Sequence, residues 1–199
     1  MSDAAVVERH PLQPFLPEGA RLLMLGSFPP PRKRWAMDFF YPNFSNQMWQ
    51  LFGLVFYGDA ERLLDKANRT FRQSDIQALL EERGIAIFDT ATAVRRLSGN
   101  ASDKDLEVVE KTDIAALLAQ LPRCRDIVCT GQKSFSVLTE DYGVAVPAMG
   151  SCNEFTLAGR LMRLWRMPSS SRAYPMPLEE KAAYYRRLMQ AVGIAAPGV

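Results

Sequence analysis

The sequence predicts an α/β fold, a three-layer α/β/α sandwich around a central, mostly parallel sheet of about four strands. Short apolar segments that suit buried strands alternate along the chain with longer segments of helical periodicity. This alternation is typical of a parallel sheet covered by helices on both faces. A chain of 199 residues is long enough for one domain with a sizeable core. We expect a single domain over residues 1–199, in which residues 1–18 form a loosely packed N-terminal extension.

The predicted sheet strands are short, apolar and bounded by residues that favour turns. They are Arg21–Gly26, Ile85–Asp89, Asp126–Gly131 and Arg160–Met167. Glu154–Leu157 precedes the last of them, and we expect it to form a hairpin with that strand around Ala158-Gly159. The polar segment Thr90–Lys104 is expected to be a loop.

The predicted helices have apolar residues at helical spacing and recognisable ends. They are Gln47–Tyr57, Asp75–Arg83, Asp113–Leu121, Lys133–Tyr142 and Leu178–Val192. Ser45 or Asn46 could cap the first helix, and Ser74 is expected to cap the second, with Gln77 at the capping-box position. Gly84 is expected to end the second helix and Pro122 the third.

The composition excludes several classes of protein. No apolar run of 18 residues is present, so no membrane span is expected, and Met1–Pro17 lacks the basic-then-apolar order of a signal peptide. A cytoplasmic location follows by default. Cys124, Cys129 and Cys152 are expected to be free thiols, too few for a four-cysteine cluster. His10 lies in the N-terminal segment, where we do not expect a ligand or base, so we expect no metal and no other cofactor.

The distribution of charge is more informative than the net charge of +2. Two stretches, Gly19–Ala36 and Phe155–Pro177, contain basic residues and no acid. The basic residues are Arg21, Arg32, Lys33 and Arg34 in the first stretch, and Arg160, Arg163, Arg166 and Arg172 in the second. Both stretches coincide with loops that follow predicted strands. They favour a surface for an anionic partner, although for the three strand arginines scattered surface charge is an equally good interpretation.

Loops follow the predicted strands after Gly26, Asp89, Thr130 and Met167, at the sheet edge where open α/β sheets bind ligands. The first loop leads into the aromatic segment Phe39–Trp49, whose side chains could stack on a base. The loop after Met167 consists of small hydroxylated residues and an arginine, which suit phosphate oxygens. This combination indicates a protein that works on a nucleobase.

These motifs, in this order, resemble the uracil-DNA glycosylase superfamily. Gly26-Ser27-Phe28-Pro29-Pro30 stands where that superfamily has its first motif. Phe40-Tyr41 and Asn46-Gln47-Met48-Trp49 resemble the aromatic pair and the Asn-x-Phe-Trp segment of the hypoxanthine-DNA glycosylase branch, often called family six. Gly84–Asp89 resembles the second strand with its terminal Asp, Thr130–Lys133 the Asn-Gly-x-Lys turn, and Met167–Ser171 the second motif with its Pro-Ser pair. The resemblance covers Arg21 to Leu188.

Two positions depart from the pattern of the superfamily. Ser27-Phe28 replaces the catalytic Asn or Asp that several branches carry in the first loop, and Met167 replaces the His that opens the second motif in the uracil enzymes. The hypoxanthine branch also lacks the first-loop group and has a functional Asn that Asn46 matches. The chain is therefore most similar to that branch.

The resemblance implies a monofunctional DNA glycosylase of base excision repair, acting as a monomer on DNA with a deaminated base, uracil or hypoxanthine. Such an enzyme flips the base out of the duplex and hydrolyses its N-glycosidic bond. The site residues it implies are Asn46 and Ser27 for catalysis; Phe28, Phe40, Tyr41 and Asp89 for the base; and Pro168, Ser169, Ser170, Ser171, Arg172 and Lys133 for DNA.

Each role has a structural alternative. Asn46 could be only a helix cap, the aromatic residues could be core, Asp89 could cap a turn, and the serine loop could be an ordinary turn. At the level of function, the missing first-loop amide also suits a non-catalytic nucleic-acid-binding module on the same fold. An unrelated doubly wound enzyme would need a Gly-x-Ser-x-Gly elbow or a Walker loop, and the sequence contains neither.

Overall fold

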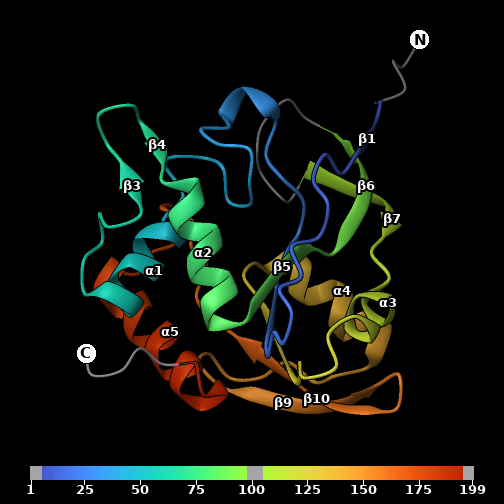
Figure 1. The fold of residues 1–199 in the computed structure, drawn as a ribbon. Coiled ribbons are helices and arrows are strands. Elements are labelled where there is room, and N and C mark those ends of the chain that lie inside the picture. Colours follow the sequence, from blue (N-terminus) through green and yellow to red (C-terminus); the bar gives the residue numbers. More distant parts are fainter. Residues whose placement is uncertain (1–5, 98–104, 195–199) are drawn as a thin grey trace.

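The computed structural model describes residues 6–97 and 105–194 and has a five-stranded central sheet of order β5-β2-β8-β10-β9 (Figure 1). The strands are β2 Leu22–Gly26, β5 Ile85–Asp89, β8 Asp126–Cys129, β9 Cys152–Leu157 and β10 Arg160–Arg166. β5, β2, β8 and β10 run parallel, and β9 pairs antiparallel with β10 as the predicted hairpin. The sheet is mostly parallel, as predicted, with one strand more than expected because β9 joins its edge.

The helices lie on both faces of this sheet. They are α1 Met48–Tyr57, α2 Gln73–Arg83, α3 Ile114–Ala119, α4 Gln132–Tyr142 and α5 Leu178–Val192. Figure 1 shows α1, α2 and α5 on one side and α3 and α4 on the other, which is what right-handed crossovers between parallel strands produce. None of the helices in the described ranges is long and apolar enough to cross a membrane.

The helix ends follow the sequence signals except at the start of α2 and at the end of α3, which stops at Ala119 before Leu121 and Pro122 are reached. Gly84 ends α2 in the left-handed conformation with a φ of 68°, as predicted. Asp113 caps α3 by accepting a hydrogen bond from the backbone N–H of Ala116 at 2.9 Å. The prediction that Ser74 caps α2 is wrong, because the helix begins at Gln73 and therefore includes Ser74.

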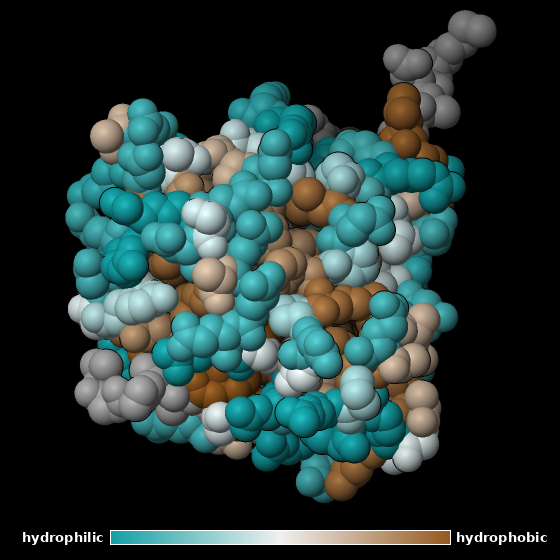
Figure 2. All heavy atoms as spheres, viewed as in Figure 1, coloured by the Kyte–Doolittle hydropathy of each residue, from teal (hydrophilic) through white to brown (hydrophobic). Residues whose placement is uncertain are grey.

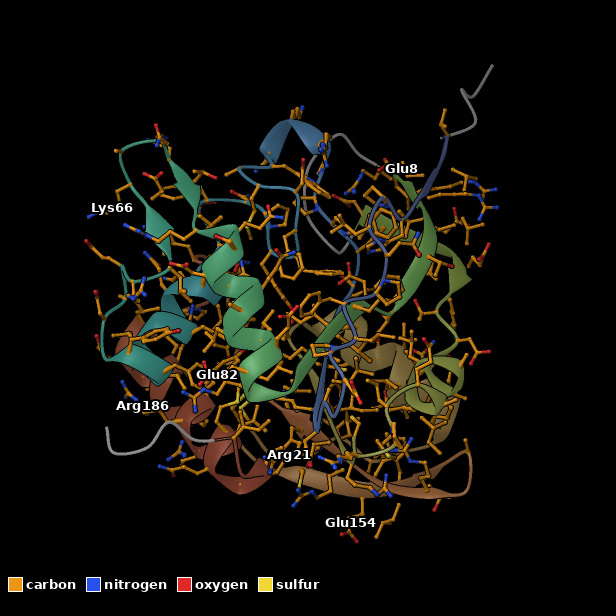
Figure 3. The ribbon with its side chains drawn as sticks, viewed as in Figure 1. Glu8, Arg21, Lys66, Glu82, Glu154 and Arg186 are labelled. Carbon is orange, nitrogen blue, oxygen red and sulfur yellow. The ribbon has the colours of Figure 1, made fainter. Side chains whose placement is uncertain are left out.

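The core lies between the sheet and the helices. β2 and β5 are buried along their whole length, as expected for parallel strands with both faces covered. Charged side chains such as Glu8, Lys66 and Glu154 project from the periphery (Figure 3), and the surface in this view is mostly hydrophilic (Figure 2). The three cysteines are free, and burial raises the pKa of the Cys124 thiol to about 11.

A second, antiparallel sheet of order β1-β6-β7 lies beyond the edge strand β5. It consists of β1 Val7–Arg9, β6 Ala91–Arg96 and β7 Leu106–Lys111, and a short hairpin is formed by β3 Leu64–Asp65 and β4 Thr70–Phe71. The expected loop over Thr90–Lys104 is therefore wrong for β6, whereas residues 98–104 lie outside the described residues. β6 forms a strand because its apolar side chains, with Phe28 and Leu106, bury one another in a small separate core.

The N-terminal segment is not loosely packed from residue 6 onward, which corrects the expectation for residues 1–18. β1 pairs with β6, and the backbone N–H of His10 donates to the carbonyl of Thr92 at 2.8 Å. Phe15 then forms a two-way backbone pair with Ile87 on the edge of β5. Residues 1–5 lie outside the described residues. This path brings His10 to the end of β5.

Candidate functional site

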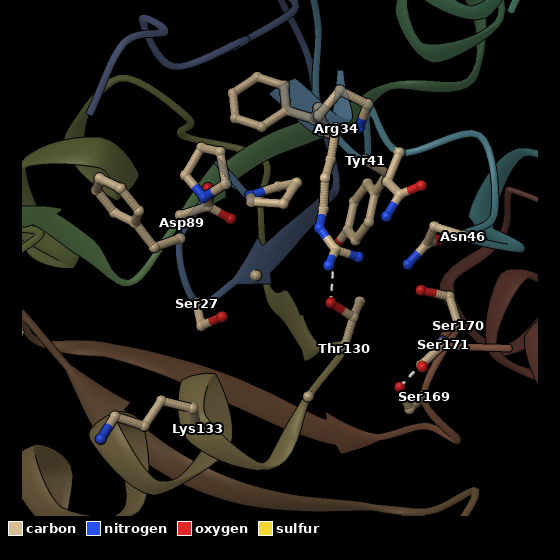
Figure 4. A pocket seen from close by; sticks show the side chains of 18 of the residues that line it. Ser27, Arg34, Tyr41, Asn46, Asp89, Thr130, Lys133, Ser169, Ser170 and Ser171 are labelled. Atoms are coloured by element: carbon tan, nitrogen blue, oxygen red, sulfur yellow. Dashed lines mark hydrogen bonds between the residues drawn. The ribbon is translucent and has the colours of Figure 1, made fainter. Parts of the chain in front are cut away.

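The loops that follow the four parallel strands converge on one cavity of about 920 Å³ (Figure 4). The walls are Gly26–Pro30 after β2, Phe39–Asn43 with Ser45 and Asn46 before α1, Asp89 at the end of β5, Thr130–Lys133 after β8, and Ser169–Ala173 after β10. The structure thus brings the loops together at the carboxyl edge of the sheet, where the sequence predicts a ligand site. Asn46 and Ser169 lie on the same cavity.

Asn46 precedes Gln47, the N-cap residue of α1, and its side chain both satisfies the first backbone N–H of the helix and lines the cavity. Its Oδ1 accepts a hydrogen bond from the backbone N–H of Met48 at 2.8 Å. Because a backbone N–H needs an acceptor, this bond fixes the orientation of the amide and leaves Nδ2 as the free end. Nδ2 has no hydrogen-bond partner among the described residues, and the side chain projects into the cavity (Figure 4). The two roles weighed for Asn46 therefore use different atoms.

The aromatic residues form one wall of the cavity. Tyr41 has a positive φ of 50°, and its hydroxyl lies 2.6 Å from Thr130 Oγ1. Burial raises the pKa of the Tyr41 phenol well above its usual value, so the hydroxyl keeps its proton and can donate a hydrogen bond. Phe28 and Phe40 are almost fully buried yet also line the cavity. All three aromatic residues could contact a base, and Trp49 behind them is core.

Asp89 lies at the end of β5 and is paired with the histidine that sequence reasoning set aside. His10 Nε2 and Asp89 Oδ2 are 2.8 Å apart, and the two side chains are 3% and 10% exposed. Asp89 Oδ1 lies over Gly26, where an added Cβ would overlap it. Among the described residues, Asp89 is the only acidic residue lining the cavity. No sequence signal pointed to His10, because its position depends on how β1 pairs.

The serine loop, which the sequence predicts to bind DNA, lines the cavity with only part of its residues. Pro168 is buried outside the cavity wall, and its carbonyl accepts a hydrogen bond from Tyr185 Oη at 3.1 Å. Ser170 is 2% exposed, and its carbonyl accepts the backbone N–H of Gln47. These two residues support the loop, whereas Ser169, Ser171 and Arg172 present accessible surface at the cavity.

A buried lysine connects the loop before α1 with the serine loop. Lys181 of α5 donates from Nζ to Gln47 Oε1 at 2.9 Å and to the carbonyl of Ser171 at 2.8 Å. The residue is completely buried, and this desolvation lowers the pKa of its ammonium group. Lys181 is therefore a support for the loop before α1 and for the serine loop.

The variant Lys181→Met is expected to destabilise the fold by about 1–3 kcal/mol, because it leaves two partly buried oxygens without their donor. Urea unfolding monitored by circular dichroism measures the change. Lys133→Met, which removes a lysine that has no partner among the described residues, is the control and should leave stability almost unchanged. Equal stability of the two variants would show that Lys181 does not support these loops.

Basic residues surround the cavity unevenly. Arg34, Lys133 and Arg172 line it, and Arg34, which belongs to the first basic stretch but was not among the predicted site residues, projects across it in Figure 4. The strand arginines are structural instead: Arg160 donates to the carbonyls of Leu118 and Leu121, Arg163 pairs with Asp126, and Arg166 donates to the carbonyl of Pro147. Asp38, the other carboxylate near the first loop in sequence, pairs with Arg32 and does not line the cavity.

No group of three or more His, Cys, Asp or Glu side chains that could hold a metal ion occurs in residues 6–97 and 105–194. Among the described residues, the polar groups that line the cavity are hydrogen-bond donors and acceptors, the carboxyl group of Asp89 and three cations. Such a set can bind a planar heterocycle through its edge and phosphate groups at the rim.

Comparison with known proteins identifies the fold. No family model matches the chain, and no curated protein matches it. The structure is similar to the solution NMR structure of a protein from Methanosarcina acetivorans described as a "putative Uracil DNA glycosylase", with a TM-score of 0.59 and 22% sequence identity. The match covers 92% of this chain and 99% of the other. At this identity the likeness establishes a shared α/β fold.

Proposed function

We propose that this protein is a DNA glycosylase that removes a deaminated base, uracil or hypoxanthine, from DNA in base excision repair. One observation carries the proposal: a cavity at the carboxyl ends of the parallel strands combines a free amide donor, aromatic walls and a basic rim. The similarity in fold to a protein described as a putative uracil DNA glycosylase supports it.

The cavity suits a base that has been flipped out of the duplex. Breaking the N-glycosidic bond leaves negative charge on the departing base, and donors fixed before the reaction stabilise that charge. Asn46 Nδ2 is such a donor because Met48 holds the other end of its amide. Ser27 Oγ has no partner among the described residues and can bind the base or the attacking water. Tyr41, Phe28 and Phe40 would contact the base faces, and stacking on an aromatic contributes roughly 1–3 kcal/mol per base.

The basic rim suits the phosphates on either side of a flipped nucleotide. Arg34 follows β2, Lys133 lies in the first turn of α4 and Arg172 follows β10, so they would contact the strand at separate points. Ser169 and Ser171 add small hydroxylated residues that let the backbone approach closely.

A base-release assay tests the proposal directly. Oligonucleotides carrying uracil or hypoxanthine, single-stranded and opposite each normal base, are incubated with the protein, and abasic sites are cleaved by alkali. We expect release of at least one of these bases and no strand cleavage before alkali. Binding to DNA without release of either base would instead support a non-catalytic nucleic-acid-binding module, which the absence of a first-loop amide at Ser27-Phe28 also favours.

Replacing Arg172 with Ala is expected to weaken DNA binding and to reduce its salt dependence, because one phosphate contact is lost. Fluorescence anisotropy with a labelled oligonucleotide at several salt concentrations measures both quantities. Arg123→Ala is the matched control, since Arg123 is also exposed but precedes β8 at the opposite edge of the sheet. Equal weakening by the two changes would remove Arg172 from the interface.

A further inference from the structure

The loop after β2 has few backbone donors with which to hold itself in place. Pro29, Pro30 and Pro31 follow Phe28 directly, and a proline has no backbone N–H. The carbonyl groups of this part of the loop are therefore its remaining anchor points. A buried carbonyl needs a donor, and Pro29 is buried. The position of Phe28 thus depends on side chains that reach the loop from elsewhere.

Two side chains donate to these proline carbonyls. Trp35 Nε1 donates to the carbonyl of Pro30 at 2.7 Å, and Arg96 Nη2 donates to the carbonyl of Pro29 at 2.6 Å. Trp35 belongs to the same stretch of chain as the loop, so it can move together with it. Arg96 lies at the end of β6 and ties the loop to the second sheet. It is the contact that fixes the loop relative to the rest of the site.

The guanidinium group of Arg96 is buried and paired. Its side chain is 9% exposed, and its Nε lies 2.9 and 3.0 Å from the two carboxylate oxygens of Glu8 on β1. A buried charge is costly unless it is paired, so strand β1 supplies the counter-ion that Arg96 needs. The adjacent Arg95 differs, as the alternation of side chains along a strand predicts. It is 40% exposed and pairs with Glu107 at 3.4 Å.

Arg96 also contacts the side chain of Phe28. Its guanidinium group lies over the Phe28 ring, 5.7 Å from the centroid, which is within the range of a cation–π contact. The ring of His10 meets the same phenyl ring in a T-shaped arrangement, 5.3 Å between centroids. Phe28 is only 8% exposed, yet it lines the cavity. These contacts hold the ring in one orientation at the cavity wall.

We propose that Arg96 is a positioning residue of the candidate site, which holds Pro29 and the ring of Phe28 so that the ring forms a fixed wall for a flipped base. This inference rests on the proposed function. A wall that is ordered before the base arrives binds it without the entropic cost of ordering a side chain. Arg96 itself does not line the cavity. Its effect on base release must therefore pass through the loop that it holds.

A double-mutant cycle on the rate of base release tests this role. Rates are measured in single turnover at saturating protein, with DNA that carries the base released by the wild type, so that they report the steps after binding. Phe28→Ala should slow release at least roughly fivefold, the loss expected for one stacking contact. Arg96→Met should slow it roughly tenfold, because a misplaced wall holds the base poorly. In the Phe28→Ala background, Arg96→Met should slow release less than about threefold, since the two residues act as a unit.

Arg95→Met is the matched control, because it removes an adjacent arginine of β6 and its ion pair from the outer face of the sheet. Its rate should stay within about twofold of the wild type, as expected for a partly exposed ion pair. Arg96→Lys serves where Arg96→Met does not fold: it keeps a charge for Glu8 but offers a single point donor for two separate acceptors. It should slow release by an intermediate factor. Full and multiplicative losses in both backgrounds would show that Arg96 does not act through Phe28, and would overturn the proposal.

Crystal structures of the wild type and of Arg96→Met, or of Arg96→Lys in its place, give a measurement that needs no activity. The carbonyl of Pro29 and the ring of Phe28 should be displaced in the variant, while β2 and β5 stay where they are. A loop that keeps its position without the guanidinium group would overturn the proposal whatever the rates. A displaced loop, together with a wild-type protein that releases no base, would refute the proposed function and leave the positioning of the loop by Arg96 established.

Discussion

Replacing Asn46 with Asp is expected to slow base release much more than tenfold while the fold stays intact. The variant keeps an oxygen that can accept the backbone N–H of Met48, so the cap of α1 is preserved. Stability should change by only a few tenths to about one kcal/mol. The change removes the Nδ2 donor and adds a negative charge beside a base that itself becomes more negative as its bond breaks. A tenfold loss in single-turnover rate corresponds to roughly 1.4 kcal/mol of transition-state stabilisation.

The variant Asn46→Ser separates the two roles of this residue. Its hydroxyl also caps a helix, but it is too short to place a donor where Nδ2 lies. Rates come from single-turnover release of uracil or hypoxanthine, and thermal unfolding shows whether each variant is folded. If Asn46→Ser keeps the full rate, Asn46 is only a cap, and the catalytic group must be sought at Ser27 or Asp89. Asp38 is not an alternative, because it does not line the cavity.

The central sheet could be predicted from the sequence because each element carries its own signal. β2 and β5 are continuous apolar segments, and α1 has its buried residues at helical spacing. The convergence of the loops followed from the same pattern, since parallel strands place their carboxyl ends at one edge. The structure brings the predicted loops to one cavity, and the roles of their residues stay predictions.

The second sheet could not be predicted because its signal is not local. β6 carries two arginines in six residues, and β1 is three residues with charged neighbours, so neither has a clear apolar pattern. They form strands because they pair with each other, in a register that places Glu8 opposite Val94. The position of His10 depends on that register. The sequence alone therefore predicted that Asp89 lies at the ligand site, but it could not predict the contact of Asp89 with His10.

The charge pattern of the sequence also could not show which arginines are free and which are bound within the fold. Arg160 and Arg172 both lie in the stretch without acids, yet Arg160 binds backbone carbonyls and Arg172 lines the cavity. An arginine with no acidic neighbour in sequence can be satisfied by carbonyl oxygens from distant segments, such as Leu118 and Leu121. The absence of nearby acids indicates a free cation only where the backbone exposes the residue.

Replacing Gly26 with Ala adds only a methyl group, yet it is expected to disturb the cavity strongly. A Cβ added there would overlap Asp89 Oδ1. Asp89 cannot move aside freely, because His10 holds its other oxygen and both side chains are buried. Gly26→Ala should therefore destabilise the protein by about 1–3 kcal/mol, as overpacking of buried sites commonly does, and should slow base release at least roughly tenfold.

A double-mutant cycle shows whether this effect arises from the carboxyl group. Without the Asp89 side-chain carboxyl, the nearest remaining group is Tyr41 Oη at 3.6 Å, an ordinary contact distance. In the Asp89→Ala background, Gly26→Ala should then cost almost nothing in stability, which gives a coupling of about 0.5–3 kcal/mol between the two positions. Gly143→Ala is the control: its Cβ would meet no atom within 4 Å, so its cost, which comes from a φ of 63°, should be the same in both backgrounds. Additive costs of Gly26→Ala and Asp89→Ala would mean that Oδ1 does not lie over Gly26 in solution, because the overlap requires both groups in place.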